Sequence, residues 1–286
     1  METRLIFAIW SMFFAGMYNF TMKMAAERKY NISYITIYTY LVTFFLSWIC
    51  LIYNNYEFSY DTILIIIFLS LLNWVSFLLS IFSRVESLKN IDSVIFFPLY
   101  KTIWPILATI LSILYFNETL SLRDTLWITL GILIPLLLIT KTEHKVQKNL
   151  LRWIFFILVT ALLTTIASWS SKTLMEHNLD IFAFMFISSI FWLVFFYFIN
   201  KYKKWVESNH TWKWFILFVI ISWLLHFLSF YAFTKALEWN LAIVYTINSL
   251  SILIPVILSV FFYKEHFNLK KWIILILSII SLILFI

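Results

Sequence analysis

Long apolar stretches separated by short polar breaks run along the whole chain. Each stretch has about the 20 residues that an α-helix needs to cross the hydrocarbon core of a bilayer. The stretches lack the two-residue alternation of a barrel strand, and hydrocarbon requires backbone groups to be paired within each segment, so they predict helices. Ten spans are predicted, at residues 5–22, 34–53, 62–82, 93–115, 124–140, 153–171, 181–199, 214–234, 241–262 and 271–286.

The composition narrows the class of protein further. Of the 286 residues, 63% are hydrophobic and 12% are charged, whereas roughly a quarter of a soluble domain is charged. A water-soluble enzyme is therefore excluded. The single cysteine, Cys50, cannot form an intrachain disulfide, and acidic residues and histidines do not cluster as metal ligands. The sequence has no glycine-rich phosphate loop, zinc-protease motif or nucleophile elbow, so it predicts no enzyme activity, metal or cofactor.

Lysine and arginine are distributed unevenly between the two sides of the predicted bundle. Sixteen of the 21 lie in the loops after spans one, three, five, seven and nine. Only four lie on the opposite side: Arg4, Arg123, Lys172 and Lys235. Because cytoplasmic loops retain positive charge, we expect both termini outside, in the cytoplasmic membrane of a bacterium. The net charge of +7 is then a signal of topology and does not indicate a surface for nucleic acid.

Two sequence patterns recur in the second half of the chain at nearly the same spacing. The pattern E-x-[LF]-[SN]-L-[RK] begins at Glu118 and again 147 residues later at Glu265, and K-x-x-x-E begins at Lys23 and again 149 residues later at Lys172. They predict two repeats of five helices in one integral membrane domain, with chance similarity of short polar loops as the alternative. Because five is odd, the second repeat would be inverted, as in transporters that bind substrate near the midplane. The predicted repeats are 1–143 and 144–286.

These features together resemble the drug/metabolite transporter superfamily, in its EamA-like branch. The resemblance covers essentially the whole chain and implies an all-α fold of ten transmembrane helices in two inverted five-helix repeats. Members carry amino acids, nucleotide sugars, cofactors or amphipathic drugs, and their helices 1, 3, 4, 6, 8 and 9 would line the path. Members are usually rich in glycine, but this chain has only Gly16 and Gly131. Close packing of its helices is therefore expected to rely on alanine and serine.

Lys101 is the one basic residue predicted inside a span, and it lies between Pro98 and Pro105. A charge at this depth costs roughly 2.5–3.5 kcal/mol on insertion scales. We expect its ammonium group to bind a carboxylate or phosphate of a cargo, or to be displaced during transport. The alternatives are snorkelling to water and bonds to carbonyls freed by the prolines. The repeat spacing places Lys101 opposite a polar group in span nine: Tyr245, Asn248, Ser249 and Ser251.

Several other side chains within the spans are candidates for the site. Tyr245 and Asn248 could orient a polar cargo, although asparagine between helices more often joins them. His226 could couple proton movement or bond to a neighbouring helix, and its counterparts in the first repeat are Asn73, Trp74 and Ser76. The remaining candidates are aromatic or polar side chains placed to contact a ring or line the same cavity: Trp74, Trp104, Trp169, Tyr18 and Asn19.

The sequence therefore predicts a secondary transporter that moves a small metabolite with an anionic or zwitterionic group, such as an amino acid, by alternating access. All 14 acidic residues lie in loops or at span ends, so no carboxylate is available at mid-membrane to carry protons. The alternatives are an exporter of amphipathic or quaternary ammonium compounds, and a scaffold or lipid-handling protein that transports nothing. Expected partners are a small-molecule substrate and membrane lipids, without nucleic acid, and the protein would be a monomer or homodimer.

Overall fold

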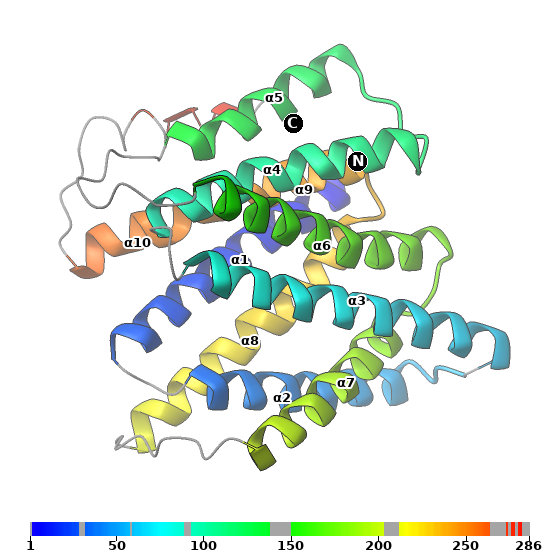
Figure 1. Cartoon of the computed structure of the whole chain (residues 1–286). Coiled ribbons are helices and arrows are strands. Elements are labelled where there is room, and N and C mark those ends of the chain that lie inside the picture. Colours follow the sequence, from blue (N-terminus) through cyan, green and yellow to red (C-terminus); the bar gives the residue numbers. More distant parts are fainter. Residues whose placement is uncertain are drawn as a thin grey trace.

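The computed structural model describes residues 2–28, 32–57, 59–88, 93–137, 150–202 and 212–263, with positions 273, 276–277 and 280–281. Every regular element in these residues is a helix (Figure 1). The elements are α1 (Glu2–Glu27), α2 (Ile32–Tyr53), α3 (Tyr60–Leu88), α4 (Ser93–Leu114), α5 (Leu122–Leu137), α6 (Leu150–Glu176), α7 (Ile181–Tyr202), α8 (Trp212–Ala236), α9 (Leu241–Ser249), η1 (Leu250–Ile252) and α10 (Leu253–Tyr263). The prediction of an all-helical protein is confirmed.

Within the described residues, eight helical stretches are long and apolar enough to cross a membrane. The fifth predicted span, at 124–140, corresponds to α5, of which 16 residues are described. The tenth, at 271–286, falls outside the described residues except for a few single positions, so the number of ten helices stays a prediction. The ninth span, predicted at 241–262 as one helix, is instead divided into α9, the 3₁₀ turn η1 and α10.

Asparagine and aspartate residues lie at the ends and at the starts of helices on one side of the bundle. Asn55, Asn117 and Asn178 follow α2, α4 and α6 with φ of 49°, 51° and 51°, a left-handed conformation that asparagine tolerates better than most residues. At the same end, the side chains of Asp180 and Asn240 accept hydrogen bonds from backbone N–H groups in the first turns of α7 and α9. These caps fix the short connections from α6 to α7 and from α8 to α9.

Helix packing follows the same pattern in both halves of the chain. The two most extensive contacts are α3 along α6 and α1 along α8, pairs that exchange when the halves exchange (Figure 1). Likewise α3 contacts α7 as α8 contacts α2, and α4 contacts α6 as the ninth span contacts α1. The equivalent helices α2 and α7 contact each other, as do α4 and α9. This pattern agrees with two repeats related by a twofold axis that passes between these last pairs.

Small residues allow the helices to approach closely. A Cβ atom at Gly16 would lie 2.6 Å from Cβ of Ile254, and one at Gly131 would overlap the methyl group of Thr246. Both glycines therefore lie where two helices touch. Alanine and serine occupy other contacts, as the scarcity of glycine predicts, and five of them are buried on α6: Ala161, Ala167, Ser168, Ser170 and Ser171.

Candidate functional site

Helix α4 and the ninth span contact each other, and each contains a proline near this contact. Pro105 lies inside α4, and Pro255 follows the turn η1. Because proline has no backbone N–H, neither can donate the usual helical hydrogen bond to the residue four positions earlier, which is Lys101 or Ser251. The two prolines are 150 residues apart in the sequence, as are Lys101 and Ser251. These four residues therefore occupy equivalent positions in the two repeats.

Lys101 reaches across this contact to the other half of the protein. Its Nζ donates a hydrogen bond to Oγ of Ser251 at 3.2 Å and lies 4.7 Å from the ring centroid of Trp104. No carboxylate among the described residues pairs with it. An ammonium group has three N–H donors, and among the described residues one hydroxyl accepts from it. Lys101 thus lies beside Ser251, one member of the polar group predicted opposite it, and a role of these residues in binding stays a prediction.

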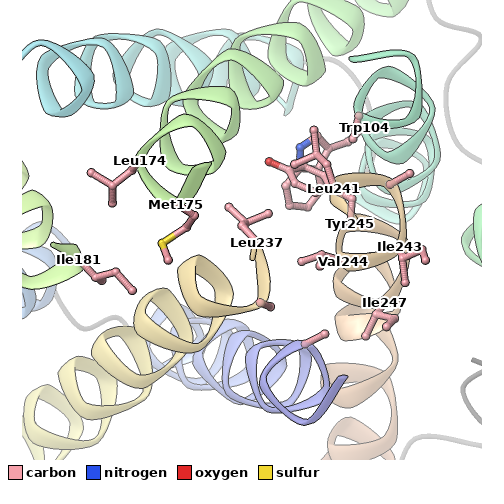
Figure 2. Close-up of a cluster of buried hydrophobic side chains, with 14 of the residues drawn as sticks. Trp104, Leu174, Met175, Ile181, Leu237, Leu241, Ile243, Val244, Tyr245 and Ile247 are labelled. Carbon is pink, nitrogen blue, oxygen red and sulfur yellow. The ribbon is translucent and has the colours of Figure 1, made fainter. Parts of the chain in front are cut away.

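Two aromatic residues, Trp104 and Tyr245, lie between α4 and α9 (Figure 2), and Trp104 is the one that contacts Lys101. The rings of Trp104 and Tyr245 pack edge to face with centroids 4.6 Å apart, and both side chains are buried. The indole nitrogen of Trp104 and the hydroxyl of Tyr245 lie within reach of each other, and no other group in the described part of the chain bonds to either atom.

The rings of Tyr100 and Trp104 form a row on α4, and a second cation, Arg84, lies beside it. From the sequence, Arg84 was counted as a loop charge. The guanidinium carbon of Arg84, near the end of α3, is 5.1 Å from the ring centroid of Tyr100. The ring of Tyr100 stacks beside Trp104 with centroids 5.7 Å apart, and its hydroxyl donates to Oγ1 of Thr164. The Nε of Arg84 is buried without a hydrogen-bond partner in the described residues. Arg84 and Lys101 therefore lie at two neighbouring rings of one row.

His226 lies in a separate aromatic cluster. Its ring centroid is 5.3 Å from that of Tyr18 and 5.3 Å from that of Tyr40. Tyr40 stacks on Trp192 at 4.7 Å, and Trp192 contacts Trp74 edge to face at 6.3 Å. Three predicted residues thus join through Tyr40 and Trp192, which the sequence analysis missed. Aromatic residues are frequent throughout these spans, so the sequence does not distinguish those that face the bundle from those that face lipid.

Two of the three asparagines predicted for the site join helices to each other. The side-chain amide of Asn248 in α9 donates to Oγ of Ser11 in α1 at 2.8 Å. The amide nitrogen of Asn73 in α3 lies 2.6 Å from the carbonyl oxygen of Ala167 in α6 and within 3.3 Å of two serine hydroxyls there. These contacts match the alternative that asparagine bonds neighbouring helices. A contact of either residue with cargo stays a prediction.

Two further predicted residues lie elsewhere in the structure. Trp169 packs edge to face against Tyr115 at 5.4 Å, near the end of α4 where the 115–121 loop begins. Asn19 is exposed on α1. The structure therefore brings together Lys101, Trp104 and Tyr245 in one group and His226, Tyr18 and Trp74 in another, and places these two residues apart from both.

The sequence profile of the EamA-like transporter family matches residues 3–140 and, a second time, residues 151–286. The chain belongs to the EamA-like transporter family. The resemblance noted from the sequence is thereby confirmed, as is the presence of two repeats, and the protein is an integral membrane protein of a family of transporters. The predicted boundary at 143 falls between the two matches and stays a prediction.

One solved structure similar to this EamA-like protein is described as "Crystal structure of protein". The two superpose with a TM-score of 0.72 over 97% of this chain and 95% of that chain, at 12% sequence identity. At this identity the likeness shows the fold alone. No curated protein matches the sequence.

Proposed function

We propose that this EamA-like protein is a secondary carrier that moves a small metabolite with an anionic or zwitterionic group, such as an amino acid, by alternating access. Lys101 would bind the anionic group, while Trp104 and Tyr245 would contact the rest of the cargo. The observation that carries the proposal is the ammonium group of Lys101, which has one protein hydrogen-bond acceptor at a depth where an uncompensated charge is costly. A cargo carboxylate or phosphate would supply the missing acceptors.

Two features support this assignment of Lys101. Its partner Ser251 is the equivalent residue of the other repeat, so the ammonium group lies on the axis between the halves, where inverted-repeat transporters bind substrate. Arg84 adds a second cation along the same row of rings. We include Arg84 in the site as a residue that attracts the anionic group toward Lys101. The proposed location is the cytoplasmic membrane of a bacterium.

The experiment is transport into vesicles by purified protein with Lys101 replaced by methionine. A thermal-shift screen of amino acids, organic phosphates, nucleotides and quaternary amines identifies the cargo first, since a bound ligand raises the apparent stability. A hydrogen bond to a charged group contributes about 1.5–3 kcal/mol, so we expect kcat/KM for an anionic cargo to fall roughly 10- to 150-fold in Lys101→Met. The same substitution at the exposed Lys235 is the matched control. Unchanged kcat/KM in Lys101→Met would contradict the role of Lys101.

The aromatic cluster around His226 favours one alternative cargo. Tyr18 and Tyr40 contact the ring of His226, and Trp192 and Trp74 extend the cluster beyond Tyr40. Aromatic faces attract quaternary ammonium groups. For a carrier of such cations, Lys101→Met would leave transport unchanged or increase it, because a repelling charge would be removed. The direction of this change separates the two proposals in one assay.

A further inference from the structure

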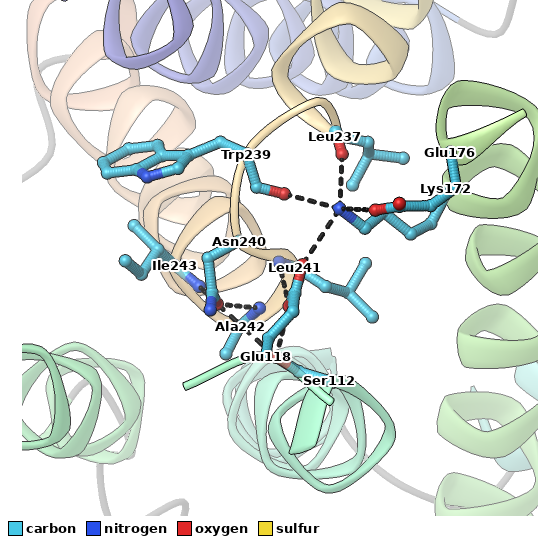
Figure 3. A network of polar contacts seen from close by, with 10 residues as sticks. All are labelled: Ser112, Glu118, Lys172, Glu176, Leu237, Trp239, Asn240, Leu241, Ala242 and Ile243. Atoms are coloured by element: carbon cyan, nitrogen blue, oxygen red, sulfur yellow. Dashed lines mark hydrogen bonds and ion pairs between the residues drawn. The ribbon is translucent and has the colours of Figure 1, made fainter. Parts of the chain in front are cut away.

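Lys172, in the last turns of α6, is surrounded by oxygen atoms (Figure 3). Its Nζ lies 2.9 Å from the carboxylate of Glu118 and 2.7 Å from that of Glu176. It also donates to the carbonyl oxygens of Leu237 and Trp239, each at 2.9 Å. We call these five residues the Lys172 network. The lysine side chain is only 2% exposed, so its charge is compensated entirely by protein groups.

The network joins helices from both halves of the chain at one end of the bundle. Glu118 belongs to the first half and follows α4, Lys172 and Glu176 belong to α6, and the two carbonyls follow α8. Glu118 also accepts hydrogen bonds from the N–H of Leu241, where α9 begins, at 2.8 Å and from the hydroxyl of Ser112 in α4. One carboxylate therefore holds the end of α4 against the start of α9.

The three charged residues of the network belong to the two repeated sequence patterns. The pattern K-x-x-x-E supplies Lys172 and Glu176, and E-x-[LF]-[SN]-L-[RK] supplies Glu118. In the second pattern, Ser121 has a different task, because its hydroxyl accepts the N–H of Asp124 and caps α5. The site around Lys101 uses neither pattern. Their meeting in space, across the two halves, indicates a function for the network in the way that the halves contact each other.

Below the network, the contact between α4 and α9 is closed as far as Lys101. Ser112 and Lys101 are eleven residues apart on α4, about 16 Å along a helix. Between them lie Trp104 and Ala108 from α4 and Leu241 and Tyr245 from α9, all of them buried. An opening at this end of the bundle would have to separate α4 from α9, and the network is what holds their ends together.

We propose that the Lys172 network is a latch, and that its release opens the site around Lys101 to the side of the membrane on which the 115–121 loop lies. The inference rests on the proposed alternating access. The Lys172 network differs from an ordinary surface ion pair such as Lys235 with Glu238. The side chains of that pair are about one-third exposed, and the two residues are three positions apart in the sequence. Lys172 and Glu118, its partner from the first half, are 2% and 14% exposed, and a buried ion pair is costly to break. Release of this pair requires the two halves to move relative to each other.

The test measures how fast a reagent reaches the closed contact. Cys50, the only native cysteine, is replaced by serine, and Ala108→Cys introduces a reporter at a position that is 0% exposed. A membrane-impermeant thiol reagent is then added from the side of the 115–121 loop. We expect Glu118→Gln and Lys172→Met each to raise the labelling rate at least tenfold, because the α4 and α9 ends separate more often. Lys235→Met, the matched control, should leave the rate unchanged.

Glu118→Gln is the decisive variant. Glutamine keeps an oxygen that can accept from Leu241 and Ser112, so it removes the charge while leaving the shape of the site. Unchanged labelling in folded Glu118→Gln overturns the proposal, even if the melting temperature falls, because the network would then serve stability alone. The reagent needs no cargo. Faster labelling without saturable transport would support the latch and contradict the proposed function. Saturable transport with unchanged labelling would support the proposed function and contradict the latch.

Discussion

Lys101 and Lys172 both place an ammonium group among the helices, but they differ in the number of acceptors around it. Lys172 lies within 2.9 Å of four oxygens, whereas Lys101 donates to Ser251 at 3.2 Å. A lysine has three N–H donors, so among the described residues the donors of Lys172 are all used, whereas Lys101 has donors left over, as the proposed binding of an anionic cargo requires. The depth of Lys101 could be predicted from the sequence. The surroundings of Lys172 could not, because they bring together segments that are far apart in the chain.

We expect Asn73→Ala to lower the free energy of unfolding by about 1 kcal/mol, since hydrogen bonds between membrane helices contribute about 0.6 kcal/mol on average and up to about 1.7. Its amide bonds α3 to α6 at the carbonyl of Ala167. Unfolding in detergent, followed by circular dichroism, measures the change. Asn19→Ala, at an exposed position, is the matched control and should change the stability little. An Asn73→Ala protein of unchanged stability but raised KM would show that the amide contacts cargo instead.

Among individual residues, those with unusual chemistry for their position were the ones that the sequence identified. Lys101 and His226 stand out as single polar groups within apolar spans, and the structure places both among aromatic rings. The sequence did not identify Arg84 as a site residue, because an arginine near the end of a span is typical of a cytoplasmic loop. Its position over Tyr100 depends on how α3 and α4 converge, which no local pattern encodes.

At the scale of the helices, the contact between α5 and α9 depends on the absence of one side chain. A Cβ at Gly131 would overlap the methyl group of Thr246, whose hydroxyl is held by the carbonyl oxygen of Ala242. We expect Gly131→Ala to destabilise the protein by about 1–3 kcal/mol, as overpacking does, although alanine favours helix more than glycine.

Thr246→Ser supplies the control for this change, because it removes only the methyl group that the new Cβ would meet. The double variant Gly131→Ala with Thr246→Ser should recover most of the lost stability in the same unfolding measurement. Equal loss in the single and double variants would show that the strain lies elsewhere.

The positions of the helices followed from the apolar runs, since a helix that crosses a membrane must be apolar over about 20 residues. Their ends did not: α1, α3 and α6 extend several residues beyond the predicted spans, because helix continues into polar sequence. The turn at 250–252 was also not predicted. It lies at the polar residues Asn248, Ser249 and Ser251, which the sequence analysis assigned to the site, and Pro255 follows it.

At the scale of the whole molecule, the repeat could be predicted because it left two sequence patterns at one spacing. Which helices meet across the halves could not, since apolar spans resemble one another in composition. The exchange of contacts, α3 with α6 and α1 with α8, depends on the shapes of helix surfaces. The sequence therefore supplied the number and order of most of the elements, and the structure supplied the neighbours.

The predicted orientation is testable with single cysteines in a Cys50→Ser background. We expect Thr119→Cys, an exposed position between α4 and α5, to react with an impermeant thiol reagent in intact cells. Ser208→Cys, in the sequence between α7 and α8, should react only after the cells are permeabilised, because segments rich in lysine stay in the cytoplasm. The opposite result at both positions would reverse the orientation of both termini.

The hydrogen bond between Lys101 and Ser251 joins two equivalent positions, one from each repeat. If the halves were identical subunits of a dimer, symmetry would place the same residue at both positions. Two lysines there would repel each other, and two serines would leave the centre without charge. Fusion of the halves into one polypeptide removes that restriction. A single positive charge can then occupy the centre of a nearly symmetric protein, with a hydroxyl from the other half as its neighbour.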